Sequence, residues 1–386
     1  MIRVLHISSS LEIGGAELFL ERLIGTMDST RFSHSVVTLF NMGKVGEHLR
    51  AHGINVTVLE THKAVPFMGL WRLRNIIRTE KPDLIQSWLY NSNIAASLAR
   101  ILTGIRCPLI WNVRHSLDTW QAEPWDTRLA IRLGGILSRT PTQVIFNSGR
   151  AVGQHERYGY RKDRAVVIPN GIDGAHFYPD EGKRADMRAR LGLDESDVVV
   201  GTLGRFHTLK NQVGFLRAAH SMLGQRADLR FVMAGGGVTP DNGHLIRLIR
   251  ELELSDRVLL LGEVDETAAL LNAMDIFVSP SLAEGFPNAV GEAMACGRPC
   301  VVTDAGASAE LVSDAGIVVP RDAPQALADA VVGMVNAGRE RRHDLGVLAR
   351  QRILQEYDQT RIAERYAVLY EEMAAIHSSN PEMDKK

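Results

Sequence analysis

The sequence predicts an α/β protein with two doubly wound, Rossmann-like domains that face a central cleft. Short β-rich runs alternate with longer helical patterns along the chain, which is typical of βαβ units and parallel sheets. The alternation stops at residues 169–182 and then resumes. A length of 386 residues also suits two to three domains, at roughly 150 residues per domain.

The first series predicts strands at residues 4–8, 36–40, 56–59, 84–87, 109–113, 144–147 and 166–169. Helical patterns lie between them at residues 16–26, 70–79, 93–102 and 151–158. The run of proline, asparagine and glycine at 169–173 follows, and we place the hinge between the domains at residues 170–180.

The second series predicts strands at residues 198–203, 231–234, 258–261, 276–280, 300–303 and 317–319. Helical patterns separate or follow them at residues 212–222, 245–252, 267–274, 289–295, 325–335 and 345–354. An amphipathic helix is predicted at 361–375, and the last residues are polar. The expected division is an N-terminal domain at 1–175, a C-terminal domain at 176–358, a closing helix at 359–377 and a tail at 378–386.

The composition is that of an ordinary globular protein, with 45% hydrophobic and 23% charged residues. Cys107, Cys296 and Cys300 are too few for a disulfide framework and lack zinc-like spacing, so they are interpreted as buried thiols in a reducing compartment. Arg3 and His6 interrupt the first apolar run, which excludes a signal-peptide core there. No stretch has the composition of a transmembrane helix, so a cytoplasmic protein is expected.

The charge differs between the two halves. Residues 1–175 hold 21 basic and 14 acidic residues, a formal charge of +7, whereas the remainder holds 23 and 31, a charge of −8. This asymmetry indicates either that the first half meets an anionic surface or that solvated faces differ in composition by chance.

A strand runs into a polar loop with two glycines, Gly14 and Gly15, just before a helix. Glycines let the backbone approach a bulky anion, and the helix N-terminus offers free N–H groups. A Gly-Gly pair before a helix is also a common turn, so this motif needs support from elsewhere. Neither the Rossmann dinucleotide fingerprint nor the P-loop motif is present.

That support comes from the first strand of the second half, which ends in a loop containing Arg205 and Lys210. A guanidinium fork and an ammonium together suit a pyrophosphate, although both could be solvated surface cations. Farther on, Glu284 precedes a predicted helix and Glu292 lies inside it. The two would be about 12 to 20 Å apart, which suits an extended ligand with hydroxyl groups at both ends.

These features resemble the family 4 retaining glycosyltransferases, which have the two-domain GT-B fold. The resemblance covers about residues 3–376 and rests on motifs in a consistent order. They are Gly14-Gly15-Ala16-Glu17, the Ile-Pro-Asn-Gly-Ile-Asp run at 168–173, Gly204-Arg205-x4-Lys210-Asn211, Glu284-x7-Glu292, the run at 303–307 and the closing helix.

The resemblance implies a nucleotide-diphosphate sugar as donor, a UDP-sugar in the first place and a GDP-sugar as the alternative, with no cofactor and no metal. Glu292 would bind the ribose, and Arg205 and Lys210, with the Gly14-Gly15 loop, would neutralise the diphosphate. The nucleobase would lie near Gly235 and Val264. The donor sugar would meet a set of residues after the fourth strand of the second half: Glu284, Phe286, Pro287 and Asn288.

Similar enzymes carry a histidine after the fifth strand of the N-domain, and His115 is the candidate here, although Arg114 beside it departs from the simpler pattern. His115, Glu284, Arg205 and Lys210 are therefore the expected catalytic residues. The N-domain would bind the acceptor, a saccharide or lipid-linked saccharide, and the closing helix would pack back on that domain. Surface polysaccharide or glycolipid assembly is expected, without a nucleic-acid partner.

The segment 120–139 combines two tryptophans with Arg128, Arg132 and Arg139, so it could be an interfacial helix at the inner face of a membrane. Its apolar side could equally pack on the sheet with the arginines in water. Two other functions also stay open: a nucleotide-sugar epimerase of the same architecture, and a catalytically inactive nucleotide-sugar-binding assembly partner.

Overall fold

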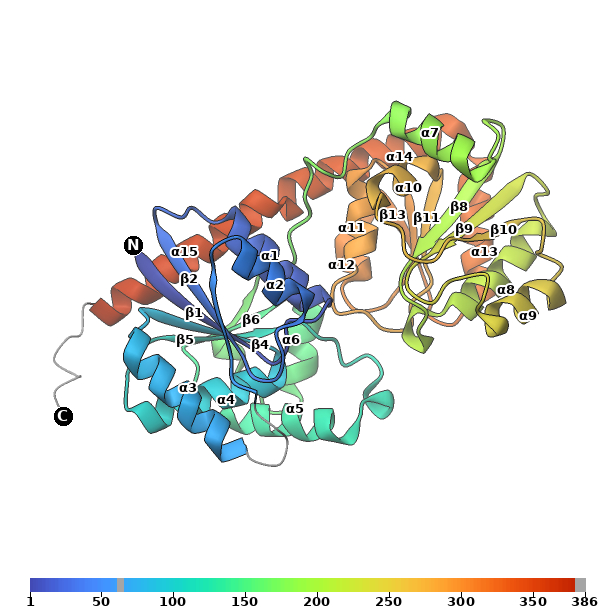
Figure 1. Ribbon diagram of the computed structural model, residues 1–386. Helices are drawn as coiled ribbons and strands as arrows, with labels where there is room; N and C mark the ends of the chain where they lie inside the picture. Colours follow the sequence, from blue (N-terminus) through green and yellow to red (C-terminus); the bar gives the residue numbers. More distant parts are fainter. Residues whose placement is uncertain (61–65, 379–386) are drawn as a thin grey trace. The chain divides into compact units, whose positions relative to one another are not determined.

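The structure is a computed structural model that describes residues 1–60 and 66–378. The chain divides into two compact units (Figure 1). Unit 1 comprises Met1–Gly171 together with the chain from Gln359 onward, and unit 2 comprises Ile172–Asp358. Each unit holds one parallel sheet with helices on both faces, as the sequence predicts.

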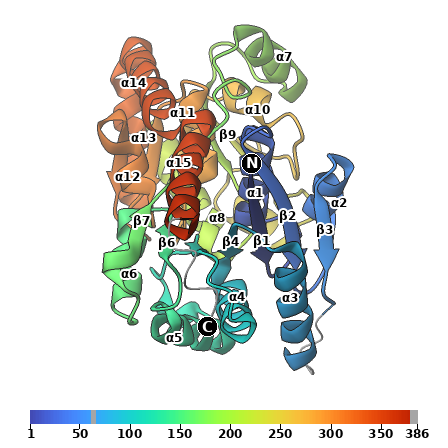
Figure 2. The same ribbon diagram turned by 90° about the vertical axis from the view of Figure 1, so that its left-hand side faces the viewer.

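Unit 1 has a seven-stranded sheet in the order β3-β2-β1-β4-β5-β6-β7. Its strands are β1 (Ile2–Ser8), β2 (Phe32–Thr38), β3 (Asn55–Val58), β4 (Leu84–Trp88), β5 (Leu109–Val113), β6 (Gln143–Phe146) and β7 (Ala165–Val167). Residues of α1 (Gly15–Thr26), α2 (Gly43–Ala51) and α15 (Gln359–Ser378) pack on one face. Those of α3 (Pro66–Glu80), α4 (Leu89–Thr103), α5 (Trp125–Leu137) and α6 (Gly149–Glu156) pack on the other (Figure 2).

The sheet of unit 1 is buried on both sides because its strands are apolar at successive positions. Along β1, Val4 faces the α1 and α15 side, whereas Leu5 and Ile7 face the α3 and α4 side. From α15, Tyr366 and Tyr370 are fully buried against the strands of unit 1. The helix at the end of the chain is therefore part of the unit 1 core.

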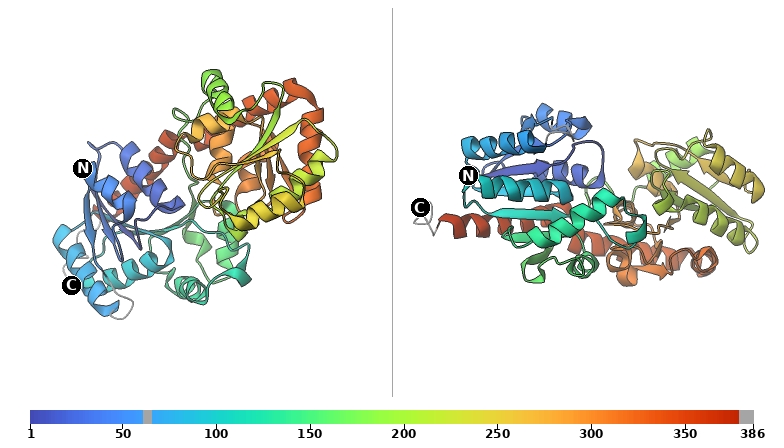
Figure 3. Two further views of the ribbon diagram at one scale, coloured as in Figure 1. Left: turned by 45° about the vertical axis from the view of Figure 1, so that its right-hand side comes forward. Right: turned by 90° about the horizontal axis from the view of Figure 1, so that it is seen from below.

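Unit 2 has a six-stranded sheet in the order β10-β9-β8-β11-β12-β13. Its strands are β8 (Val198–Leu203), β9 (Leu229–Ala234), β10 (Val258–Leu260), β11 (Ile276–Ser279), β12 (Cys300–Thr303) and β13 (Gly316–Val319). One face carries α8 (Gln212–Leu223), α9 (Gly243–Glu251) and α13 (Pro324–Asn336). The other carries α7 (Glu181–Leu191), α10 (Thr267–Ala273), α11 (Asn288–Ala295), α12 (Ser308–Val312) and α14 (Gly338–Arg352) (Figure 3).

Both sheets reverse their strand order next to their first strand, between β1 and β4 in unit 1 and between β8 and β11 in unit 2. Connections leave this switch point in opposite directions, so the loops at the carboxyl ends of the two strands part and leave a crevice. Open α/β sheets bind their ligands there.

The structure differs from the predicted elements mainly in helices. Of the strand predicted at 36–40, residues 36–38 form the end of β2 and residues 39–40 lie beyond it, and α14 begins at Gly338 rather than near 345. α2, α7 and α12 were not predicted. In α7 the buried face includes Arg184 and Arg188, so a search for apolar periodicity does not find it.

The prediction of buried thiols is confirmed: Cys107, Cys296 and Cys300 are all buried and free. Burial raises the pKa of the Cys107 and Cys296 thiols to about 12. They are therefore protonated and unreactive at neutral pH.

Candidate functional site

The expected site residues fall into two sets. Gly14, Gly15 and His115 belong to unit 1, and all the others belong to unit 2. In each unit they follow carboxyl ends of strands, on the edge of the sheet where the switch point lies.

In unit 2, the loops after β8 and β9 pack backbone against backbone. Gly235 has φ +133°, and a Cβ there would lie 2.3 Å from the carbonyl oxygen of Gly204. The Phe206 N–H donates to the Gly236 carbonyl at 2.6 Å. Only glycine fits at position 235, and its neighbours fix the course of the loop that carries Arg205.

The loop after β8 is also tied to the loop after β11. The Leu282 N–H donates to the Leu209 carbonyl at 2.8 Å, and Asn211 Nδ2 donates to the Pro280 carbonyl at 3.2 Å. We call residues 204–211 and 280–287 the unit-2 switch loops. These bonds across the switch point hold Lys210 opposite Glu284.

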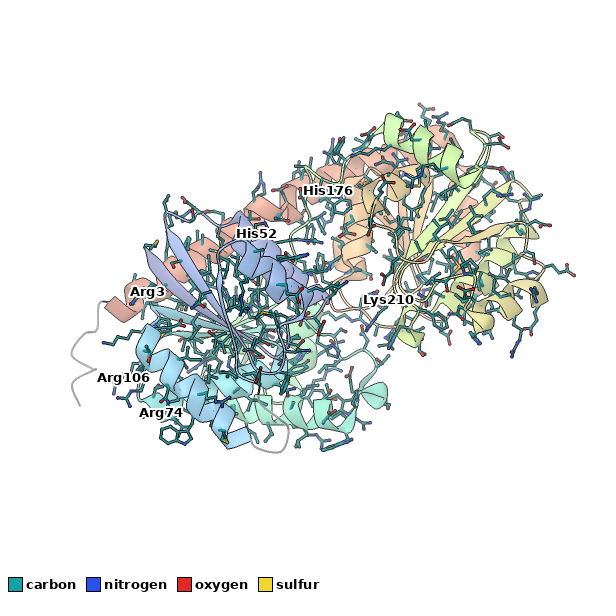
Figure 4. All side chains as sticks on the ribbon, viewed as in Figure 1. Arg3, His52, Arg74, Arg106, His176 and Lys210 are labelled. Atoms are coloured by element: carbon teal, nitrogen blue, oxygen red, sulfur yellow. The ribbon has the colours of Figure 1, made fainter. Side chains whose placement is uncertain are left out.

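Lys210 and Glu284 form an ion pair between the switch loops. Lys210 Nζ donates to Glu284 Oε1 at 2.6 Å, and Ser281 Oγ donates to the same oxygen at 2.7 Å. The Glu284 side chain is 8% exposed and that of Lys210 is 33% exposed. Figure 4 labels Lys210 at this end of the unit 2 sheet.

The ion pair leaves both residues able to bind a ligand. An ammonium has three protons, so Lys210 can serve Glu284 and still donate to phosphate oxygens. Both hydrogen bonds that reach Glu284 from the described residues fall on Oε1, which keeps Oε2 available for a hydroxyl group. Beneath it, Gly306 has φ +52°, and a Cβ there would lie 1.6 Å from the Glu284 carbonyl oxygen. The backbone of Glu284 is therefore held closely from below.

α11 starts directly after the second switch loop, with Pro287 at its N-cap and Asn288 as its first residue. Phe286 is buried and contacts Tyr357, with ring centroids 5.9 Å apart. Glu292 lies four residues after Asn288, on the same side of the helix, and is 9% exposed. A buried glutamate on this edge suits recognition of hydroxyl groups better than a surface role.

The expected nucleobase residues lie next to each other after β9 and β10. A Cβ on Gly236 would be 2.8 Å from Glu263 Oε1, so the Gly235 turn touches the segment that precedes Val264. Val264 is half-buried and packs against the core of unit 2. Arg205 is exposed, and its carbonyl accepts from Gln212 Nε2 at 2.9 Å, which anchors its backbone but leaves the guanidinium toward solvent.

In unit 1, Gly14 is the N-cap of α1 and has an extended backbone, and Gly15 begins the helix. The Glu17 carboxylate folds over this turn, because a Cβ on Gly14 would lie 2.3 Å from Glu17 Oε2. Burial raises the pKa of Glu17. The Glu17 carboxylate thus lies at the N-terminus of α1, where the sequence predicts that the Gly14-Gly15 loop binds an anion. The sequence alone did not predict this position of Glu17.

His115 follows β5 and has a carboxylate partner that the sequence did not reveal. Its Nε2 lies 2.8 Å from Oε1 of the buried Glu123. The Tyr90 and His115 rings pack edge to face with their centroids 5.9 Å apart, and the Tyr90 hydroxyl donates to His155 Nε2 at 2.8 Å. His155 Nδ1 bonds to a backbone carbonyl, and burial lowers its pKa to about 4, so it is neutral. Glu123 lies in the irregular segment before α5, where no periodicity marks it.

Arg114, which departs from the expected pattern, is a buried structural residue. Its guanidinium lies 3.8 Å from the centre of the Phe19 ring and bonds to Asn170 and Tyr366. Burial lowers its pKa. It joins α1, α15 and the segment after β7 within unit 1.

Among residues 1–60 and 66–378, no group of three or more His, Cys, Asp or Glu side chains is arranged to hold a metal ion. No helix in the same residues is long and apolar enough to cross a bilayer.

Known proteins match both units. The family described as "Glycosyltransferase Family 4" matches residues 13–176, and the one described as "Glycosyl transferases group 1" matches residues 197–337. EpsF of Bacillus subtilis (strain 168), a glycosyltransferase by name, is 28% identical over 309 residues, which are 78% of this chain and 79% of that protein.

A further relative is the Escherichia coli UDP-Gal:alpha-D-GlcNAc-diphosphoundecaprenol alpha-1,3-galactosyltransferase, 28% identical over 256 residues, 65% of this chain and 64% of that protein. The crystal structure of Anabaena HepE in complex with UDP is similar with a TM-score of 0.84 and 23% identity, over 96% of this chain and 100% of that one. Two family matches in order, on two units with the expected sheets, show that this chain belongs to the family 4 glycosyltransferases and has the GT-B fold.

Proposed function

We propose that the protein is a retaining, metal-independent hexosyltransferase. It takes a sugar from a nucleotide-diphosphate donor, a UDP-sugar in the first place and a GDP-sugar as the alternative, and transfers it to a saccharide or lipid-linked saccharide. The single observation that carries this proposal is the Lys210–Glu284 pair between the unit-2 switch loops. It sets a cation for a phosphate beside a carboxylate for a sugar hydroxyl.

The roles proposed for the other residues are those that the family resemblance implies. Glu292 binds the ribose, Gly235 and Val264 contact the base, and the backbone of Phe286, Pro287 and Asn288 holds the sugar with Glu284. Arg205 and Lys210 neutralise the diphosphate in place of a metal ion. The residues of unit 1 keep the roles expected from the sequence: the Gly14-Gly15 loop as a further donor to the diphosphate, and His115, paired with Glu123, as a group that acts at the donor sugar.

The reaction is a substitution on one face of the anomeric carbon. The bond from that carbon to the diphosphate breaks, the departing β-phosphate oxygen accepts the proton of the acceptor hydroxyl, and the new glycosidic bond forms on the same face. Catalysis then rests on positioning and on stabilisation of the negative leaving group by Arg205 and Lys210.

A panel of nucleotide sugars tests this function. UDP- and GDP-hexoses are incubated with and without saccharide acceptors, and release of free nucleoside diphosphate is followed together with product mass. Acceptor-dependent release that is lost in Glu284→Gln supports the transferase. Conversion of the donor to its epimer without release would establish the alternative epimerase, and tight binding without either reaction would establish an inactive assembly partner.

We also propose that unit 1 meets an anionic membrane, where a lipid-linked acceptor would reside. The exposed side of α5 is apolar, formed by Trp125 (76% exposed), Leu129, Leu133 and Ile136 (72%), at helical spacing. The helix instead packs inward through small residues such as Gly134 and Gly135. The alternative in which the apolar side packs on the sheet is therefore wrong for these residues.

Basic residues also lie on α5 and just after it. Arg132 and Arg139 are exposed, whereas Arg128 is partly buried and donates to the Glu123 carbonyl at 2.7 Å. Trp71 of α3 and Ile101 of α4 are also exposed, and the Arg74 guanidinium lies 4.7 Å from the centre of the Trp71 ring. Figure 4 labels Arg74 and Arg106 on the surface of unit 1. A mixture of exposed apolar and basic residues suits an anionic lipid surface, and the E. coli relative acts on a diphosphoundecaprenol-linked sugar.

Co-sedimentation with vesicles of phosphatidylglycerol and of phosphatidylcholine tests the membrane contact. Leu129→Ser with Ile136→Ser should reduce recovery on phosphatidylglycerol, and Arg132→Glu with Arg139→Glu should reduce it in a salt-dependent way. Equal recovery of all variants in all pellets would contradict the proposal. Surface substitutions on α9 of unit 2, such as Arg247→Glu, are the matched control.

A further inference from the structure

Unit 2 has a second concave site at the amino ends of its strands, opposite to the switch loops. It lies next to Asp275, which precedes β11, and Pro299, which precedes β12. α7 and α14 flank it, and both lie at the top of unit 2 in Figure 1. The cavity measures about 80 Å³, several times the roughly 10–15 Å³ that one ordered water needs on the same measure.

The cavity is strongly basic. Five of its lining residues are arginine or histidine: Arg184, Arg298, Arg339, Arg342 and His343. Two lining carboxylates, Glu181 and Asp275, oppose them. We call these seven residues the cationic pocket.

One of the two carboxylates, Asp275, already accepts several hydrogen bonds. Asp275 Oδ1 accepts from Arg184 at 2.8 Å, and Oδ2 accepts from Arg188 at 3.3 Å and from the Val199 N–H at 2.8 Å. Arg188 is fully buried behind the pocket. Asp275 is therefore shared between Arg184, which lines the cavity, and Arg188, which does not, so the lining keeps more positive than negative side chains.

The remaining arginines repel one another. Burial lowers the pKa of Arg298 and Arg342, and the charge of Arg184 lowers both further, whereas the charge of Asp275 raises both and offsets only part of this. Arg298 is fixed by Nη1, which donates to the Met274 carbonyl at 3.2 Å, and Arg342 by Nη1, which donates to the Val335 carbonyl at 3.0 Å. These hydrogen bonds hold the arginines close together although their charges repel, and a bound anion would reduce that repulsion.

We propose that the cationic pocket binds a phosphate-bearing anion, at a site on unit 2 separate from the donor site. Arginine forks match phosphate oxygens in geometry and charge. Arg339, Arg342 and His343 lie at spacings of three and four on α14 and so present their side chains on one side of the helix. The anion could be a soluble phosphorylated metabolite or a lipid headgroup.

The pocket is also connected to the donor site by one helix. α11 begins at Asn288, beside the second switch loop, and its C-cap is Cys296, whose carbonyl accepts from Arg298 Nε at 3.0 Å. An anion that binds Arg298 would therefore act on the C-terminal end of the helix that carries Glu292. This connection does not depend on the proposed donor or acceptor.

Titration with inorganic phosphate at constant ionic strength, followed by calorimetry, tests the proposal. The experiment uses the full chain carrying Lys210→Gln, which weakens phosphate binding at the switch loops. In that background, phosphate should still bind in the millimolar range, and Arg339→Gln with Arg342→Gln should raise the Kd at least tenfold. Arg341→Gln, on the same helix but outside the cavity, should change the Kd less than twofold.

Unchanged phosphate binding in Arg339→Gln with Arg342→Gln would overturn the proposal, as would the absence of binding in the Lys210→Gln background. A second arm identifies the source of the anion. If the same double variant also loses binding to phosphatidylglycerol vesicles, the ligand is a headgroup; if only binding of phosphate and of a sugar phosphate weakens, it is a soluble anion.

Discussion

Replacing Lys210 with methionine would leave the Glu284 carboxylate, 8% exposed, with only the Ser281 hydroxyl of its two present donors. Breaking a buried pair from one side costs roughly 3–5 kcal/mol, and the 33% exposure of Lys210 lets water compensate for part of it. We expect Lys210→Met to lower the free energy of unfolding by about 2–3 kcal/mol. Glu284→Gln should cost only about 1 kcal/mol, because the lysine left behind can reach solvent.

The tryptophans make this change measurable in one unit. All five lie at positions 71 to 125, within unit 1, so their fluorescence reports on that unit, whereas far-UV circular dichroism reports on both. Lys210→Met should lower the dichroism transition by roughly 4–12 °C, at a few degrees per kcal/mol for a unit of this size. The fluorescence transition should move much less.

The double variant Lys210→Met/Glu284→Gln decides between a coupled pair and two independent residues. With a coupled pair, the double variant is more stable than the sum of the single costs predicts, by at least about 1 kcal/mol. Additive costs, or equal costs of the two single variants, would show that Lys210 and Glu284 are not a coupled ion pair. Ser281→Ala tests the other hydrogen bond on Glu284 and should cost about 1 kcal/mol.

Three further predictions concern binding, turnover and pH. Glu292→Ala should raise the calorimetric Kd for the nucleoside diphosphate, because its carboxylate meets the non-reacting ribose, whereas unchanged binding would remove that assignment. Glu123→Gln should lower kcat by a larger factor than it raises KM and should shift the pH dependence of kcat, because it changes the partner of His115. If the variant changes only the stability of the protein, Glu123 has a structural role. Burial lowers the pKa of His34 and His155 to about 4, so the unfolded chain binds protons first. The free energy of unfolding of unit 1, followed by fluorescence, should therefore fall as the pH decreases from about 6.5 to 4, by up to about 3 kcal/mol per histidine. A free energy of unfolding that does not change over this pH range would contradict the prediction.

The strands could be predicted because their β-branched and leucine-rich runs are buried on both faces of parallel sheets. α7 could not, because Arg184 and Arg188 supply much of its buried face and bond to backbone carbonyls and Asp275. A prediction from the spacing of apolar residues places such arginines on the exposed face of a helix. Their burial depends on partners about 90 residues away.

The sequence predicts the individual residues of the site but not the contacts between them. Lys210 and Glu284 were found separately, one as a cation for phosphate and the other as a carboxylate for sugar. Their pairing requires β8 and β11 to be neighbours, which only the strand order supplies. Glu123 shows the same limit, since it lies eight residues from His115 in an irregular segment.

The configuration of the transferred sugar is the most direct test of the central claim, that the unit-2 switch loops catalyse retaining transfer with cations of the protein rather than a metal ion. After treatment with EDTA, the protein is incubated with an α-linked nucleotide sugar and its acceptor, and the anomeric proton of the product is followed by NMR. We expect an α-linked product formed at the same rate with and without added Mg²⁺. A β-linked product, or strict dependence on added metal, would contradict it.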